Sequence, residues 1–146
     1  MIQNLAIASD HAGYKLGMAL YEKMLMKYLN VYHLGCASTV STDYPLFAHR
    51  VAEQMKAFES NRGILVCGSG VGMSIAANRH SHIRAALIER PGQARYARLH
   101  NGINVLCLSG NRLTLEDAWP IVKAFLFTDA DEDERHKRRR RMLNES

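Results

Sequence analysis

The chain has 146 residues, of which 47% are hydrophobic and 23% charged, and this near-average composition excludes disordered, collagen-like and coiled-coil proteins. No apolar run approaches the roughly 18 residues that a membrane-spanning helix needs, and the N-terminus lacks the layout of a signal peptide. Three cysteines in a chain that needs no disulfide staples indicate a reducing compartment. We therefore expect one cytoplasmic domain over residues 1–146, with no membrane partner.

The formal net charge of +5 is unevenly distributed. Residues 128–146 carry six basic and six acidic side chains, so the excess lies in residues 1–127. A diffuse excess with one basic cluster behind an acidic one is weak evidence for nucleic-acid binding and suits a small anion equally well. We expect a small-molecule partner and no nucleic acid.

Strand and helix patterns alternate along the chain. The first half predicts a strand at residues 5–9, a helix at 14–29, a strand at 30–34, a helix at 46–58 and a strand at 63–67. The second half predicts a helix at residues 73–78, a strand at 83–88, a helix at 91–100, a strand at 103–108 and helices at 115–127 and 131–143.

Two features refine the helices near the C-terminus. Pro120 lies inside the helix at residues 115–127 and predicts either a kink or a later start. The last helix has its acidic residues at the N-terminal end and its basic residues toward the C-terminal end, as the helix dipole prefers.

Five strands separated by helices predict an α/β fold, a three-layer doubly wound sheet of five parallel strands with helices on both faces and a C-terminal helix. Ligands of such sheets bind outside the carboxyl ends of the strands. The candidates at those ends are Asp10, His11, Cys67 with the glycine turn that follows it, Glu89 and the loop at residues 109–112.

The glycine turn at residues 68–72 follows a buried strand and precedes a helix. Three glycines in five residues let backbone N–H groups converge on an anion. Met73 and Ser74 follow where a nucleotide P-loop needs Lys and Ser or Thr, which excludes that motif. The glycine spacing also departs from the dinucleotide fingerprint, but Glu89 stands where a ribose-binding acid would be. A nucleotide-binding module therefore remains an alternative.

Cys67 directly precedes the glycine turn. Thiols at helix N-termini near cationic groups serve as bases or nucleophiles, whereas free cysteines in general are buried and inert. The adjoining turn, with His and Arg at neighbouring strand ends, favours a catalytic role. Cys36 and Cys107 lack such a setting and are expected to be structural, and no cysteine pair has zinc-type spacing.

Histidines and arginines supply the other candidates. His11 suits phosphate or hydroxyl contacts, and His100 suits an acid or base that enters a cleft. Arg135 and Arg139 share one helix face and could clamp one phosphate; a solvated face and a nucleic-acid patch are the alternatives. The remaining central histidines are assigned to surface or core: His33, His49, His80 and His82.

Together these residues resemble the type B ribose-5-phosphate isomerases, a family that also includes allose-6-phosphate and galactose-6-phosphate isomerases. The shared motifs run in order over essentially the whole chain: SDHAG at 9–13, TDYP at 42–45, CGSGVGMS at 67–74, HN at 100–101 and RH at 135–136. The resemblance implies interconversion of D-ribose 5-phosphate and D-ribulose 5-phosphate through an enediolate, with no metal or organic cofactor. It also implies a homodimer or tetramer whose clefts are built from both subunits.

The resemblance also implies roles by position. Cys67 would move the proton between C2 and C1, and His100 would open the furanose ring. Asp10 and Ser69 would handle the sugar oxygens, and Asn101 would contact the substrate. The N–H groups of the turn would hold the enediolate oxyanion: Gly68, Ser69, Gly70, Val71 and Gly72. The phosphate ligands would be His11, Arg112, Arg135 and Arg139.

Galactose-6-phosphate isomerases tend to lack the catalytic Cys or the ring-opening His in one or other of two different subunits. Both residues are present here, which favours a self-sufficient pentose-phosphate isomerase. Isomerisation of allose 6-phosphate or another six-carbon aldose phosphate remains the alternative. Two departures from the family stand out. The segment at residues 109–112 is one residue longer than usual, and Arg138, Arg140 and Arg141 add charge that the family role does not require.

Overall fold

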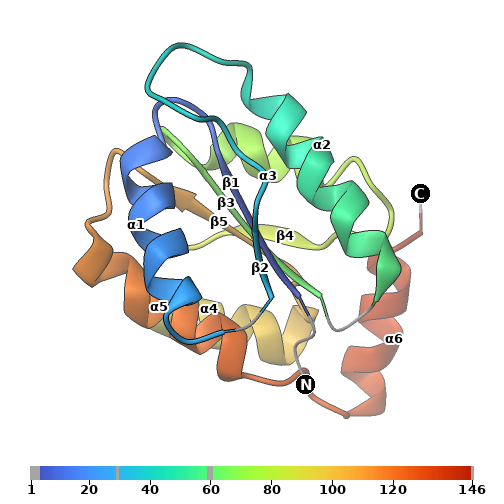
Figure 1. Cartoon of the computed structure of the whole chain (residues 1–146). Helices are drawn as coiled ribbons and strands as arrows, with labels where there is room; N and C mark the ends of the chain where they lie inside the picture. Colours follow the sequence, from blue (N-terminus) through green and yellow to red (C-terminus); the bar gives the residue numbers. More distant parts are fainter. Residues whose placement is uncertain (1–3, 29, 59–60, 146) are drawn as a thin grey trace.

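The computed structural model describes residues 4–28, 30–58 and 61–145. Five parallel strands form one sheet in the order β2-β1-β3-β5-β4 (Figure 1). The strands are β1 (Leu5–Ser9), β2 (Val31–His33), β3 (Arg62–Cys67), β4 (Ala85–Leu87) and β5 (Val105–Ser109). The doubly wound parallel sheet predicted from the strand–helix alternation is confirmed.

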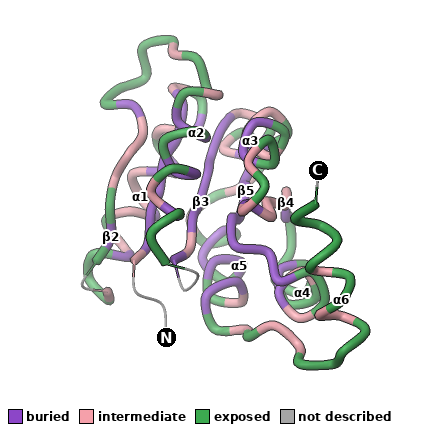
Figure 2. Tube along the Cα trace, turned by 90° about the vertical axis from the view of Figure 1, so that its right-hand side faces the viewer, coloured by how far each residue is buried: buried purple, intermediate pink, exposed green. Residues whose placement is uncertain are grey.

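Helices cover both faces of this sheet. They are α1 (Tyr14–Leu25), α2 (Tyr44–Gln54), α3 (Val71–Ala77), α4 (Pro91–Tyr96), α5 (Leu115–Phe127) and α6 (Glu134–Leu143). In β3, Ile64 and Val66 belong to the core cluster under α1, α4 and α5, whereas Leu65 and Cys67 belong to the cluster under α2 and α3. Both faces of the strand are therefore buried, which explains its continuous apolar sequence. Figure 2 shows this buried centre and the largely exposed α6.

Several boundaries differ from the prediction. Helix α1 ends at Leu25 rather than at residue 29, which lies outside the described residues. Tyr28 lies beyond the end of the helix but still packs on the core, so the apolar pattern in the sequence continued past that end. Helix α3 begins at Val71, inside the glycine turn. The predicted helix at residues 91–100 is α4 followed by one π-helical turn, Ala97–Asn101. Helix α6 begins later than predicted because the Asp133 carboxylate caps it, accepting the Arg135 N–H at 2.8 Å.

Helix α5 begins at Leu115, so a start delayed by Pro120 is wrong. A capping box fixes that start: the Thr114 hydroxyl accepts the Asp117 N–H at 3.2 Å, and the Asp117 carboxylate accepts the Thr114 N–H at 3.1 Å. Pro120 and Glu116 are both exposed, so the one helical hydrogen bond that proline cannot form lies on the outer face of the helix.

The sheet order places a switch point between β1 and β3. From β1 the chain crosses to β2 on one side, and from β3 it continues to β4 and β5 on the other. Crevices at such switch points, outside the carboxyl ends of the strands, are where α/β sheets bind ligands. In the part of the chain that the structure describes, no helix is long and apolar enough to span a bilayer.

Candidate active site

Three loops meet at the carboxyl ends of β1, β3 and β5. They comprise residues 10–13, 68–70 and 110–114. The Gly110 N–H donates to the Cys67 carbonyl at 2.8 Å, and a Cβ added to Gly110 would lie 3.0 Å from a backbone atom of the first loop. The close approach of the three backbones brings the predicted Asp10, Cys67 and glycine-turn residues to one place.

The Cys67 side chain is held at the start of the glycine turn. It is 4% exposed, and the Gly70 N–H donates to its sulfur at 3.1 Å. Gly70 has φ +79°, a left-handed conformation, and a Cβ there would lie 2.5 Å from the Leu87 side chain. Only glycine suits both constraints. The contact with the Gly70 N–H therefore fixes the sulfur beside the backbone of the turn.

The rest of the glycine turn is fixed by neighbouring hydroxyl and aromatic groups. The Ser109 hydroxyl donates to the Gly68 carbonyl at 2.6 Å. The Ser69 hydroxyl accepts the Val71 N–H at 3.2 Å. The Val71 N–H, which was predicted to hold the oxyanion, therefore has a partner within the turn. A Cβ added to Gly72 would lie 2.5 to 2.9 Å from side-chain atoms of Tyr44, which therefore packs directly on the turn.

His11 is oriented by Thr42, a residue to which the sequence analysis gave no role. The Thr42 N–H donates to His11 Nδ1 at 3.0 Å, and the His11 N–H donates to the Thr42 hydroxyl at 3.2 Å. Because Nδ1 accepts, the proton of the neutral ring lies on Nε2, which becomes a donor for an anion. Asp10 is 5% exposed and accepts the Gly13 N–H at 2.9 Å. The TDYP motif signalled Thr42 and Tyr44 without indicating what they contact.

Arg112 and Glu89 form an ion pair at 3.3 Å between the loops that follow β5 and β4. The two side chains are 72% and 46% exposed, and pairs so exposed contribute little to stability. Arg112 is thus at the same end of the sheet as His11, as predicted. Glu89, the acid that the nucleotide-binding alternative requires for a ribose, has a cationic partner instead.

The other predicted site residues lie at the opposite end of the sheet. His100 and Asn101 belong to the π-helical turn before β5, and α6 packs against that turn, carrying Arg135 and Arg139. Cys67 pairs with Ser109, the last residue of β5. Because a parallel strand rises about 3.3 Å per residue, the length of β5 separates the two groups by about 13 Å. Figure 1 shows α6 where the strands begin. The expectation that His100 enters the Cys67 cleft is not met within one chain.

His100 is exposed and lies against residues of the C-terminal segment. Its ring centroid is 4.6 Å from that of His136 and 5.5 Å from that of Tyr96. His136 Nδ1 is 3.2 Å from the Asp131 carboxylate. The Asp133 N–H, and after it His136, hold the pKa of Asp131 below its ordinary value. This carboxylate therefore stays ionised to lower pH and remains able to hold His136. His136 received no role from the sequence, although the RH motif contains it.

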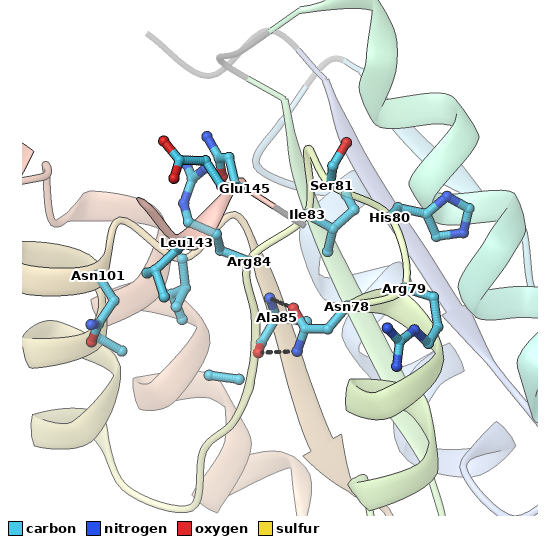
Figure 3. A pocket seen from close by; sticks show the side chains of 14 residues that line it. Asn78, Arg79, His80, Ser81, Ile83, Arg84, Ala85, Asn101, Leu143 and Glu145 are labelled. Carbon is cyan, nitrogen blue, oxygen red and sulfur yellow. Dashed lines mark hydrogen bonds between the residues drawn. The ribbon is translucent and has the colours of Figure 1, made fainter. Parts of the chain in front are cut away.

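Asn101 lines a cavity of about 500 Å³ beside β4 (Figure 3). Asn78 closes the outer edge of β4 there: its amide donates to the Ala85 carbonyl and accepts the Ala85 N–H, both at 2.8 Å. The cavity has walls from the segment after α3, from β4 and from the end of α6. It is therefore separate from the loops around Cys67.

The two other cysteines lie in the core under α2 and α3. All three cysteines are free. Burial, and to a lesser degree the neighbouring Cys67, raises the pKa of the Cys107 thiol, as fits a structural residue. Across the described ranges, no group of three or more His, Cys, Asp or Glu side chains could hold a metal ion.

Known proteins share this arrangement over nearly the full chain. The family model described as Ribose/Galactose Isomerase matches residues 5–143. A probable ribose-5-phosphate isomerase B of Mycoplasma genitalium is 41% identical over 138 residues, covering 93% of this chain and 90% of that one. A ribose 5-phosphate isomerase structure from Thermotoga maritima superposes with a TM-score of 0.93 at 44% identity, covering 98% of each chain.

A second solved structure, the M. genitalium enzyme with bound ribulose-5-phosphate, has a TM-score of 0.89 and 39% identity, and covers 98% of this chain and 97% of that one. The matched region contains both groups of predicted site residues, those around Cys67 and those around His100. On this evidence, the chain belongs to the Ribose/Galactose Isomerase family.

Proposed function

We propose that this chain is an aldose–ketose isomerase that interconverts D-ribose 5-phosphate and D-ribulose 5-phosphate. The observation that carries the proposal is the buried Cys67 thiol, which accepts the Gly70 N–H at 3.1 Å at the switch point of the sheet. Family membership and the ribulose-5-phosphate bound to a 39% identical relative support the same substrate.

The reaction needs one base and a set of preorganised donors. A proton leaves C2 of the aldose and negative charge develops on the enediolate oxygens. A proton is then delivered to C1, and the hydroxyl proton passes from O2 to O1. Cys67 is the base, and backbone N–H groups of the glycine turn stabilise the oxyanion; each well-aimed donor contributes about 3–4 kcal/mol to transition-state stabilisation. Cys67 and the glycine turn are adjacent in sequence, and the contact of the Gly70 N–H with the Cys67 sulfur supports this pairing of roles.

Substrate binding divides between the two ends of the sheet. His11, oriented by Thr42, and Arg112 serve the phosphate from the Cys67 end, and Asp10 and Ser69 serve the sugar oxygens. His100 opens the ring and Asn101 contacts the substrate, with Arg135 and Arg139 as further phosphate ligands. We infer that this second group acts on the Cys67 cleft of another copy, in a homodimer. The strand length between the groups and the exposure of His100 and Arg139 support that inference.

The rest of the biochemical setting follows the same proposal. We place the reaction in the non-oxidative pentose phosphate pathway and in the cytoplasm, because a thiol base suits a reducing compartment. The chemistry uses side chains and backbone donors of this chain and no organic cofactor. The ion pair of Glu89 with Arg112 offers the nucleotide-binding alternative no support.

The test is an assay of both directions of the interconversion, with and without EDTA, on the native protein and on Cys67→Ala and Cys67→Ser. We expect chelator-resistant turnover that falls at least about 100-fold in both variants, since loss of a positioned base costs about 10²- to 10⁴-fold. Cys36→Ala is the matched control and should keep most of the rate. An inactive native protein, or a Cys67→Ala variant that keeps most of its rate, would contradict the proposal.

A further inference from the structure

A strongly basic cavity of about 790 Å³ lies at the amino ends of the strands, away from Cys67. Its walls come from the segment after α2, from β3, from the segments before β4, β5 and α6, and from α6 itself. Seven of the residues that line it are Lys or Arg, and none of the described lining residues is Asp or Glu. Six of them define what we call the basic cavity: Arg62, Arg84, Arg98, Lys137, Arg140 and Arg141.

Backbone carbonyls hold the guanidinium groups of the basic cavity in place. Arg98, 5% exposed, donates from Nε to the Thr128 carbonyl at 2.9 Å. Arg140 donates from Nη2 to the Asp131 carbonyl at 2.6 Å, and Arg84 donates from Nε to a further backbone carbonyl at 3.0 Å. These contacts with carbonyl oxygens fix the positions of the guanidinium groups around the cavity.

The cations of the basic cavity repel one another. Burial, followed by the charge of Arg62, lowers the pKa of Arg98 to about 10. Burial, followed by the charge of Arg84, lowers the pKa of Arg62 as well. Asp129 opposes both shifts but ranks behind these causes. A bound anion would relieve this repulsion.

Helix α6 presents different basic residues to the basic cavity and to the proposed active site. Residues at spacings of i, i+3 and i+4 share a helix face, and Lys137, Arg140 and Arg141 line the cavity with that spacing. Arg135 and Arg139 lie on the opposite face at 100° per residue. The cavity therefore uses charge that the proposed phosphate clamp does not.

We propose that the basic cavity is a second anion site, which binds a small molecule carrying two or more phosphate groups. Pyrophosphate and nucleoside triphosphates have this chemistry. Cations on several walls match more than one phosphate, and the volume is typical of small-molecule sites. A concave site favours a small ligand over a nucleic acid strand, which binds along an extended basic surface. The proposal does not depend on the isomerase reaction.

The test is calorimetric titration with pyrophosphate, and separately with ATP, at fixed ionic strength. The variant is Lys137→Gln/Arg141→Gln; Arg141 is exposed, and Lys137 forms only exposed ion pairs with Glu132 and Glu134, so the fold is kept. The control, Lys27→Gln/Lys123→Gln, removes the same charge from exposed positions elsewhere. We expect pyrophosphate to bind the native protein and the control equally, and the cavity variant at least tenfold more weakly.

A further variant and a further ligand separate this site from other sources of binding. His11→Ala, which alters the Cys67 end, should leave the pyrophosphate affinity unchanged. No binding at millimolar pyrophosphate or ATP, equal losses in both double variants, or loss in His11→Ala would each overturn the proposal. A single-stranded RNA that binds more tightly than pyrophosphate, with the same loss in the cavity variant, would assign the surface to nucleic acid and overturn it too.

Discussion

The two ends of the sheet carry different kinds of binding chemistry. At the carboxyl ends, glycines bring backbone N–H groups close to a buried thiol, and hydrogen bonds between loops fix their positions. At the amino ends, long basic side chains gather around a cavity and on α6. Backbone donors are short and rigid and suit a reacting atom, whereas arginines reach farther and suit charged groups that need only be held.

The same contrast divides the proposed active site. The Cys67 half is held by backbone contacts that depend on glycine and would be lost with most other residues. The His100 half instead depends on a side-chain contact with His136 at the protein surface. One half is complete within the chain, and the other faces outward. The proposed site built from two copies would bring these two halves together.

Replacing His100 tests the outward-facing half. We expect His100→Ala to lower turnover of ribose 5-phosphate about 100-fold, because a positioned acid or base contributes about 10²- to 10⁴-fold. Steady-state kinetics measures the loss, and thermal unfolding should show an unchanged fold because the side chain is exposed. His49→Ala is a control on another exposed histidine. An unchanged rate in His100→Ala would remove this residue from the mechanism.

Replacing Gly70 tests the backbone-held half. Gly70→Ala forces a Cβ into the left-handed region and against Leu87, at a cost of about 2–4 kcal/mol in unfolding free energy. Turnover should fall as well, because the N–H that contacts Cys67 moves. Chemical denaturation measures the first effect. Gly92→Ala is the control, since a Cβ there meets nothing within 4 Å; equal stability losses in the two variants would contradict this account.

Replacing Thr42 separates orientation of His11 from the chemistry. Thr42→Val removes the hydroxyl that accepts the His11 N–H, and one such hydrogen bond contributes about 1 kcal/mol. We expect KM for ribose 5-phosphate to rise several-fold with kcat little changed, because His11 serves the phosphate and not the proton transfer. Thr42→Ser, which keeps the hydroxyl, should restore KM. A loss confined to kcat would place Thr42 in the chemical step instead.

The smallest effect is expected at the exposed ion pair between Glu89 and Arg112. Glu89→Gln should change the unfolding free energy by no more than about 0.5 kcal/mol. Freed from its carboxylate partner, Arg112 should bind phosphate at least as well, so KM should stay constant or fall. A large rise in KM would show that Glu89 itself contacts the substrate.

The sequence predicts those features that depend on local pattern. The strand–helix alternation placed Asp10, Cys67 and the glycine turn at one edge of the sheet, and the structure confirms it. It did not show that Thr42 holds His11, because the two are 31 residues apart and only the fold joins them. Nor did it show how far His100 lies from Cys67, since the rule for strand ends does not apply to a residue that precedes a strand.

The basic cavity could not be predicted from the sequence, for a similar reason. Arg62, Arg84 and Arg98 are widely spaced along the chain and belong to no common motif. Each of them looks like an ordinary basic residue until the sheet and α6 bring them together. The extra positive charge of Arg140 and Arg141 was the one feature of the sequence that pointed to this surface, and it did not identify a ligand.

Mixing two inactive variants tests the shared site most directly. Cys67→Ala and His100→Ala, purified separately, are combined at equal amounts, allowed to exchange subunits and assayed for ribose 5-phosphate isomerisation. In a two-fold dimer, half of the random pairs are mixed, and each mixed pair has one intact cleft of two, so about a quarter of the native activity should return. Activity that stays at the level of the separate variants after proven exchange would contradict a site built from two copies.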